Sequence, residues 1–126
     1  MPVLSREVRL EALRHCVRGC TLRLFANDYE PCDEDAVGDF VEADFPGYEP
    51  KELDDEQWKD KGLSLSYPAQ VFVLTEDLDI WQRVYGWYLT RDDCVVMAHR
   101  TANAPERIVT KGSKIKVPGL SLAEKP

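Results

Sequence analysis

The densest group of potentially reactive side chains is an acidic run. Its residues are Asp33-Glu34-Asp35-Ala36-Val37-Gly38-Asp39, and it continues to Asp44. Aligned to a calcium-binding loop, the run places carboxylates at loop positions 1, 3, 7 and 12 and glycine at position 6. However, position 5 is Val37, which has no side-chain oxygen, and a strand is expected before the run where a calcium loop has a helix. A calcium loop and an acidic surface loop both remain open, and the pattern favours the surface loop.

Cysteines form the second group with possible chemistry. Cys16 and Cys20 are one helical turn apart and His15 is adjacent, which is the beginning of a zinc site. A structural zinc site usually has two close ligand pairs, whereas Cys32 and Cys94 are isolated. The first residues alternate charged and apolar types and do not resemble a secretion signal, so we expect free thiols in a reducing compartment and no metal.

Cys94 and His99 would be the simplest nucleophile and base. They are five residues apart in an expected strand, where odd separations place side chains on opposite faces, so we expect that they do not meet. The acidic pair Asp92 and Asp93 lies in an expected turn, surrounded by water. No nucleophile elbow or phosphate-binding loop is present. The sequence therefore predicts no enzyme, no catalytic residues and no cofactor.

Four aromatic residues close together, Trp81, Tyr85, Trp87 and Tyr88, favour either a carbohydrate-binding platform or a core strand. In a strand Tyr85 and Trp87 share one face while Tyr88 takes the other. Aromatic residues in a central strand usually belong to the core, so we expect Trp87 to be buried. Gly86 between them predicts a bulge or a close backbone approach.

A mainly β fold must position these residues. Residues 5–18 predict a helix, with Ser5 as its N-cap and Gly19 as its end. After Gly19 the apolar period changes to two, and turn signals recur about every ten residues, which is typical of an antiparallel β-sandwich or barrel. The expected strands are 21–27, 51–53, 63–67, 70–75, 82–90, 94–100, 108–109 and 114–117, with 120–122 as an extension of the last.

Length and composition fit one soluble domain. The chain has 126 residues, of which 44% are hydrophobic, so it is long and apolar enough to bury a core and is not disordered. It contains no apolar run long enough to cross a bilayer. We divide it into an N-terminal helix (1–19), which either docks on a partner or caps the sheet, and a β-sandwich domain (20–126).

Charge is distributed unevenly along the chain. The acidic segment, residues 28–60, has 14 Asp and Glu residues against two Lys, and the formal net charge of the whole chain is −7. Basic residues are scattered, so nucleic acid is not an expected partner. A protein partner or a second copy is expected to contact the helix and the acidic segment. The candidate partner-binding residues are Arg6, Arg9, Leu10, Leu13, Arg14, Val17, Asp33, Asp35 and Asp39.

Three segments together carry a family resemblance. They are TLRLFANDYEP (21–31), GDFVEADFPGYEPKEL (38–53) and VYGWYLTRDDCVVMAHR (84–100). In this order they resemble small β-sandwich structural proteins of tailed bacteriophages and prophages, over about residues 20–122. The most specific part is Phe40-x-Glu42-Ala43-x-Phe45-Pro46-Gly47-Tyr48. Its three aromatic residues also predict that this segment is fixed to the sandwich although it is rich in Pro and Gly.

The resemblance implies a virion component without catalytic residues. The function it favours is capsid decoration, in which the protein binds the head lattice as a cement protein and forms a homo-oligomer. Its partners would be the major capsid protein or tail subunits, and it would be assembled in the host cytoplasm without membrane contact. The alternative is a tail or fibre module that recognises a host glycan or another tail protein.

Overall fold

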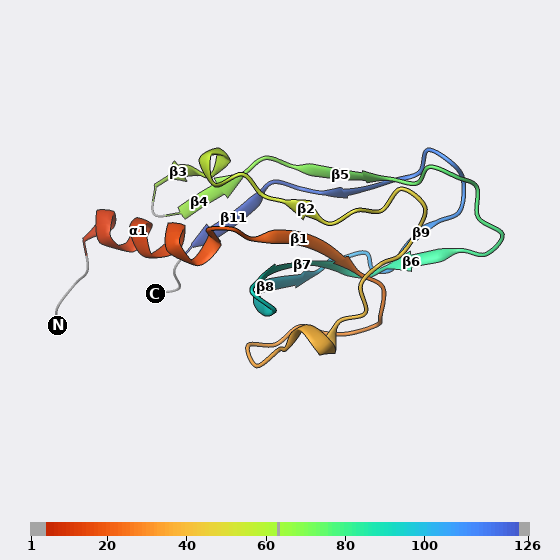
Figure 1. Cartoon of the computed structure of the whole chain (residues 1–126), viewed down its shortest axis with the longest axis horizontal. Coiled ribbons are helices and arrows are strands. Elements are labelled where there is room, and N and C mark those ends of the chain that lie inside the picture. The colour runs from red at the N-terminus through yellow and green to blue at the C-terminus, as the bar shows by residue number, and fades with distance from the viewer. Residues whose placement is uncertain (1–4, 63, 124–126) are drawn as a thin grey trace.

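The computed structural model describes residues 5–62 and 64–123 as two layers of antiparallel strands with one N-terminal helix (Figure 1). The elements are α1 (Arg6–Val17), β1 (Thr21–Phe25), the 3₁₀ helix η1 (Val37–Asp39), β2 (Lys51–Glu52), the 3₁₀ helix η2 (Asp55–Gln57), β3 (Lys59–Lys61), β4 (Ser64–Tyr67), β5 (Gln70–Val73), β6 (Gln82–Val84), β7 (Gly86–Arg91), β8 (Cys94–Arg100), β9 (Glu106–Ile108), β10 (Lys114–Val117) and β11 (Leu120–Ala123). The expected fold class, a mainly β antiparallel sandwich with an N-terminal helix, is confirmed.

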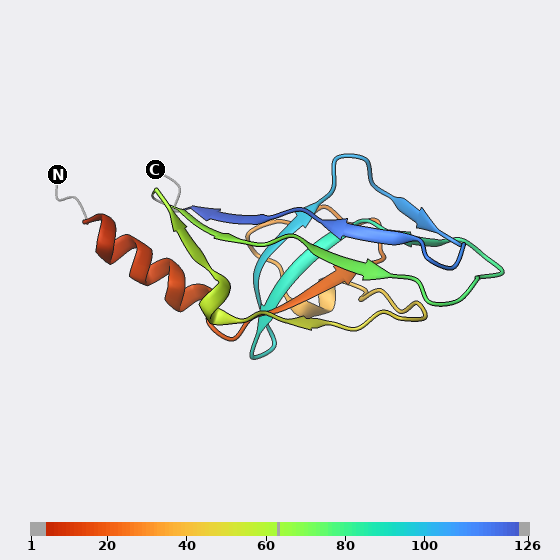
Figure 2. The same cartoon turned by 90° about the horizontal axis from the view of Figure 1, so that it is seen from above.

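One layer is a long two-stranded ribbon with β3 added at one end. β5 pairs with β10 and β4 pairs with β11. The pair Leu120↔Tyr67 follows Val117↔Gln70 by three residues on each strand, so the two pairings form a single ladder (Figure 2). Pro68 and Pro118 lie in the interruption, where proline cannot donate a ladder hydrogen bond. Residues 120–122, which were expected to extend strand 114–117, therefore do continue this ladder. Their partner strand is β4, whereas the partner of β10 is β5.

The second layer is a four-stranded sheet in the order β2-β1-β7-β8. Leu22 and Leu24 of β1 pair with Leu89 and Trp87 of β7, and all four side chains are buried in the main core. The burial expected for Trp87 is confirmed, at 7% exposure. These side chains alternate along each strand with residues that point away from the core, so the sheet has a core face and an outer face.

Gly86 marks a close approach, as its position between aromatic residues predicts. A Cβ at this position would overlap the carbonyl oxygen of His99 and the ring of Phe25. The expected strand 82–90 is divided here, because β6 pairs with β9 while β7 pairs with β1 and β8. The sequence also did not predict β3, whose residues are all exposed.

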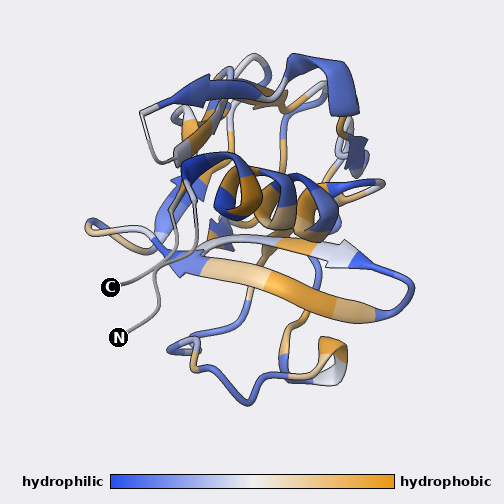
Figure 3. Cartoon of the chain, turned by 90° about the vertical axis from the view of Figure 1, so that its left-hand side faces the viewer, coloured by the Kyte–Doolittle hydropathy of each residue, from blue (hydrophilic) through white to orange (hydrophobic). Residues whose placement is uncertain are grey.

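Helix α1 closes one end of the sandwich. The Ser5 hydroxyl accepts a hydrogen bond from the Val8 amide at 3.2 Å, and Gly19 follows the helix with φ 69°. Seen from that end, α1 lies between the two layers (Figure 3). Leu10, Leu13 and Val17 are buried in the main core together with the strands. The expectation that these three residues form a docking surface is therefore wrong. The apolar side of α1 is narrow, and it is buried against the sheets of the same chain.

A long connection, residues 26–50, joins β1 to β2, and we call it the strap. It first crosses the outer face of the four-stranded sheet and then returns to the free side of β1 (Figure 1). There the Ala26 amide donates to the Val41 carbonyl at 2.7 Å, and the Ala43 amide donates to the Leu24 carbonyl at 2.9 Å. The strap thus completes the edge of β1 beyond the two residues covered by β2.

Candidate functional site on the outer face of the sheet

The outer face of the four-stranded sheet is divided into an aromatic half and a polar half. The aromatic half is closed by the strap, whose Phe40 stacks on Tyr88 with 4.6 Å between ring centroids. Phe25 and Tyr29 meet Phe40 edge-on at 5.1 and 5.3 Å. Phe40 and Phe45 are 6% and 4% exposed, so the expectation that this part of the strap is fixed to the sandwich is confirmed.

The polar half contains a continuous chain of hydrogen bonds. Arg23 on β1 donates from Nη1 to both carboxylate oxygens of Glu42 at 3.0 Å, and from Nε to the Thr90 hydroxyl at 3.0 Å. The Tyr48 hydroxyl donates to Glu42 Oε2 at 2.5 Å and accepts from the Leu24 amide at 3.3 Å. That amide lies where the strap loops away from β1, so Tyr48 replaces a missing backbone partner.

These contacts shift the ionisation of two tyrosines. The pKa of Tyr88 is raised to about 12, chiefly by burial and in smaller part by the Glu42 carboxylate, while the Arg23 guanidinium partly opposes the change. Burial also raises the pKa of Tyr48, and the hydrogen bond to Glu42 acts in the same direction. Both phenols are therefore neutral at ordinary pH.

A pocket of about 460 Å³ opens above the polar half. Its lining includes the Thr90 hydroxyl and charged groups of both signs, from Arg23, Glu42, Arg91, Asp92 and Asp93. Asp92 and Asp93 form the two-residue turn between β7 and β8 with φ of 48° and 63°, a left-handed conformation that Asp tolerates better than most residues. The turn signal in the sequence was correct. Chemically, the pocket offers hydrogen-bond donors and acceptors to a polar group.

Arg91 on the pocket wall also holds helix α1. Its Nη1 donates to the carbonyl oxygens of His15 at 2.5 Å and Cys16 at 3.2 Å, in the last turn of the helix. These carbonyls have no acceptor role within the helix, and a cation there also complements the helix dipole. Arg91 thus joins the wall of the polar pocket to the C-terminal end of α1.

A second hollow of about 470 Å³ lies beside strand β8. One wall is the apolar part of β8, and the other is the strap at Pro31, Cys32, Asp33 and Asp35. Its chemistry differs from that of the polar pocket, because no cation lines it. We call it the β8 groove.

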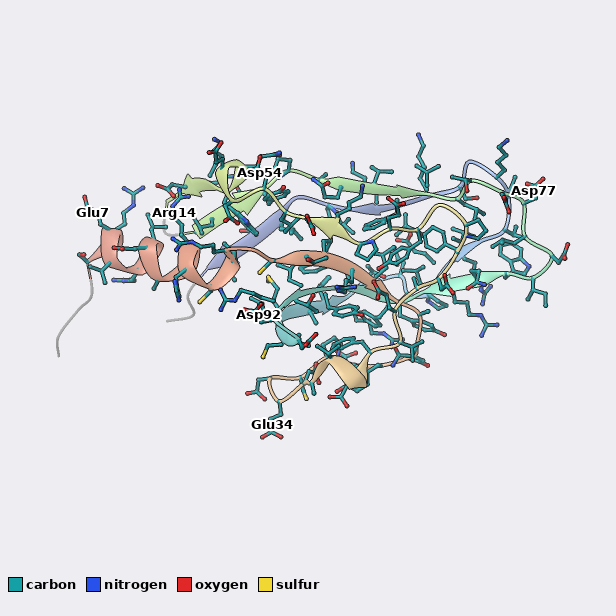
Figure 4. The ribbon with its side chains drawn as sticks, viewed as in Figure 1. Glu7, Arg14, Glu34, Asp54, Asp77 and Asp92 are labelled. Atoms are coloured by element: carbon teal, nitrogen blue, oxygen red, sulfur yellow. The ribbon has the colours of Figure 1, made fainter. Side chains whose placement is uncertain are left out.

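The predicted arginines of the helix are not gathered with the predicted acidic residues. Figure 4 shows Arg14 on α1 and Glu34 on the strap at separate places on the molecule. Arg14 forms an ion pair with Asp60 of the same chain, and Arg6 donates from Nε to the Gly62 carbonyl at 3.0 Å. Arg9 is half-buried. The charge complementarity expected between copies is therefore partly used within one chain.

The predicted acidic residues mostly stabilise turns of the strap. Asp35 accepts hydrogen bonds from the Tyr29 hydroxyl and from the Cys32 amide at 2.8 Å. Partial burial opposes its ionisation, but these hydrogen bonds hold the pKa of Asp35 below its usual value. Asp39 accepts from the Ala36 amide at 2.8 Å, whereas Asp33 is exposed beside the β8 groove.

No metal site is formed by the part of the chain that the structure describes. Among these residues no three His, Cys, Asp or Glu side chains converge so as to hold an ion. Cys16, Cys20, Cys32 and Cys94 are free thiols, and burial raises the pKa of the Cys20 thiol.

Cys94 and His99 do not meet, although the reason differs from the one predicted. Leu89 pairs with Met97 and Thr90 with Val95, so Val96 is the extra residue of a β-bulge. The bulge returns Cys94 and His99 to the same face of the sheet. They pair with Arg91 and Trp87, which are four residues apart on β7, or roughly 13 Å at the usual rise of a strand.

The carbohydrate-binding platform, which the sequence left open as the alternative to a core strand, is not assembled from the four aromatic residues. Tyr85, Trp87 and Tyr88 are buried, and they are divided between the main core and the aromatic cluster on the outer face. Only Trp81 of the four is exposed, at 58%, beside Ile80 at 78%, in the loop between β5 and β6.

Sequence reasoning missed the hydrogen-bonded chain around Glu42. One signal could have indicated it. Arg23 is a charged residue within the otherwise apolar strand Leu22–Phe25, so it needs a partner if the opposite face is covered. The sequence did not show that the partner would be Glu42, 19 residues away in the strap.

No family model, curated protein or solved structure matches this chain. No helix within residues 5–62 and 64–123 is long and apolar enough to span a bilayer. The class that the geometry defines is thus a small antiparallel β-sandwich with an end-capping helix, a polar pocket and an open sheet edge.

Proposed function

We propose that the protein is a structural component of a tailed-phage virion, of the type that decorates and stabilises the head lattice. One observation carries the proposal. In the segment with the most specific resemblance, Phe40 to Tyr48, most of the large side chains build the fold. Phe40 joins the aromatic cluster, Glu42 and Tyr48 join the polar chain, and Phe45 lies in the main core. Because this motif builds the fold, its resemblance supports a fold like that of the phage β-sandwich proteins. Through the fold, it supports a structural role of the same kind.

The surface features support a role in assembly. β8 is an open strand edge, and the loop tip with Ile80 and Trp81 is an exposed apolar group. Interface cores are enriched in aromatic residues, and open edges pair with strands of other chains. A subunit that fits into a lattice needs such surfaces.

The experiment is a search for the chain in purified particles. We expect it in virions from a host that carries its gene, at a fixed stoichiometric ratio to the major capsid protein, with sandwich-shaped density on the head lattice. Particles made without the chain should bind the purified protein and resist heat or low salt better afterwards. A chain that stays in the lysate and is absent from particles would contradict the proposal.

A tail or fibre module that recognises a glycan is the second candidate, and the exposed Trp81 favours it. If this role is correct, density appears on the tail, and Trp81→Ala abolishes binding to host cells without changing the thermal unfolding temperature. Because Trp81 is an isolated aromatic side chain and not part of a platform, head decoration is the proposal we place first.

A further inference from the structure

Strand β8 has one open edge. Within the described residues it pairs with β7 on one side only, and at seven residues it is the longest strand in that part of the chain. It contains no Pro or Lys, two residues that commonly protect an edge from additional pairing. Its outer N–H and C=O groups are thus placed to bind another extended backbone.

The β8 groove runs along this edge rather than over one face of the sheet. Val95 and Ala98 pack toward the aromatic cluster on the outer face, while Val96 and Met97 pack toward the main core. All four line the groove. The groove volume of about 470 Å³ lies within the range of pockets that bind ligands in proteins.

The opposite wall makes the groove acidic. Asp33 is exposed there, and Asp35 is kept ionised by hydrogen bonds from the Tyr29 hydroxyl and the Cys32 amide. An extended strand presents its side chains alternately to two sides. The segment that fits this groove therefore alternates apolar residues, which lie beside Val96 and Met97 on the core side of the sheet, with basic residues, which lie on the outer side and face the strap.

We propose that the β8 groove binds an extended segment of a partner protein, with alternating basic and apolar residues, as an added β-strand on β8. Main-chain hydrogen bonds to the edge supply affinity, and the two walls supply specificity. The inference rests on the proposed function in one respect, since the partner would be a neighbouring virion protein.

A second copy of this chain fits the groove less well. Two-fold pairing of β8 with its own copy keeps the same face of both sheets upward, so both straps would lie on one side of the new strand pair. Asp33, Glu34 and Asp35 of the two copies would then repel one another. The bulge at Val96 also divides β8 into two short stretches, residues 94–95 and 97–100, which pair with β7 in different registers.

The test uses the full chain and a synthetic peptide, acetylated and amidated, of seven alternating lysine and valine residues. We expect the peptide to perturb the backbone NMR signals of Val95 to Arg100 and to slow hydrogen exchange of their amides. A glutamate–valine peptide of the same pattern, and the lysine–valine peptide N-methylated at every second amide, should both bind much more weakly. The first control removes the charge match and the second removes the backbone hydrogen bonds.

Two charge reversals provide a matched pair. Asp33 lines the groove, whereas Glu34 is exposed on the same turn and does not line it. At physiological salt, where screening limits charge effects to about 8 Å, Asp33→Lys should weaken peptide binding about fivefold and Glu34→Lys less than about twofold.

Three results would overturn the inference: no change in β8 on adding the peptide, equal binding of the glutamate–valine peptide, or protected β8 amides in a dimer without peptide. The last would make a second copy the occupant. Failure here differs from failure of the proposed function. If the chain is found in particles but does not bind the peptide, only the proposed binding site at the β8 groove is contradicted. If the chain binds the peptide but is absent from particles, only the virion role is contradicted.

Discussion

The two faces of the four-stranded sheet are built from the same strands but are held by different forces. On the core face, Leu22, Leu24, Trp87 and Leu89 pack in the main apolar core. On the outer face, the neighbouring residues of the same strands bind the strap through one aromatic stack and the hydrogen-bonded chain around Glu42. A sheet face can therefore be covered by another segment without being apolar, provided that each polar group on it finds a hydrogen-bond partner.

The two faces should respond differently to salt and pH. Hydrophobic burial is insensitive to salt at moderate concentrations and to pH, whereas charge-assisted hydrogen bonds are weakened by salt and by a change of protonation. We therefore expect substitutions on the core face to have large effects that do not depend on conditions. Those on the outer face should have smaller effects that do.

The largest effect is expected from Trp87→Ala. Its side chain is 7% exposed in the core, and removing a buried large aromatic side chain costs about 3–5 kcal/mol of the free energy of unfolding. Urea titration should show this loss equally at low and high salt. Trp81→Ala is the control, since that side chain is 58% exposed and its loss should change stability by less than about 0.5 kcal/mol. Equal effects of the two substitutions would contradict the core assignment of Trp87.

The next effect concerns the pair Arg23 and Glu42. Replacing either by Ala leaves a partly buried charge without its partner and should lower the free energy of unfolding by about 1–3 kcal/mol. A double-mutant cycle should give a coupling that decreases with added salt. The pair Arg14 and Asp60, whose side chains are 40% and 46% exposed, should show a coupling below about 1 kcal/mol. A larger coupling at the helix than at the strap would reverse our ranking.

A smaller effect is expected from Tyr48→Phe. The substitution keeps the ring but removes the hydroxyl that joins Glu42 to the Leu24 amide, at a cost of about 1–2 kcal/mol. Tyr85→Phe is the matched control, because the Tyr85 hydroxyl forms no hydrogen bond within the described residues. Thermal unfolding followed by circular dichroism measures both. The hypothesis fails if Tyr48→Phe is as stable as the original chain while Tyr85→Phe is not.

The smallest effect at neutral pH concerns Tyr88, which should matter only in alkali. Its pKa in the folded protein is about 12, against 10.0 for the ordinary group, chiefly because of burial. The folded state therefore favours the neutral phenol. This stabilisation is fully present below pH 10 and is lost as the pH rises from 10 to about 12. Stability measured across that range should fall less steeply in Tyr88→Phe, and an unchanged slope would show that Tyr88 ionises freely.

Much of the local structure followed from the sequence. Ser5 and Gly19 define the ends of α1 through capping and a left-handed residue, and the Asp92-Asp93 turn defines the hairpin of β7 and β8. The alternation in β1 correctly placed Leu22 and Leu24 on one face. These features depend on residues within about one turn or one hairpin of each other, so short-range preferences were sufficient to predict them.

The candidate site followed much less directly. Cys94 and His99 were assigned to opposite faces by parity, but the bulge at Val96 changed the parity. Leu10, Leu13 and Val17 have the pattern of an amphipathic helix, which shows that the stripe must be covered but does not show by what. The sheets of the same chain cover it.

By itself the sequence determined a mainly β chain with one helix, its hairpin turn, the burial of Trp87 and the fixing of Phe40 to Tyr48 to the sandwich. Only the tertiary structure decided that Glu42 meets Arg23, that Tyr48 replaces a backbone partner of Leu24, and that β8 is left as an open edge beside Asp33. The physical reason is the distance along the chain over which each interaction acts. Capping and strand alternation are decided by near neighbours, whereas strand order and the course of the strap depend on contacts between distant residues, which form only when the whole core is assembled.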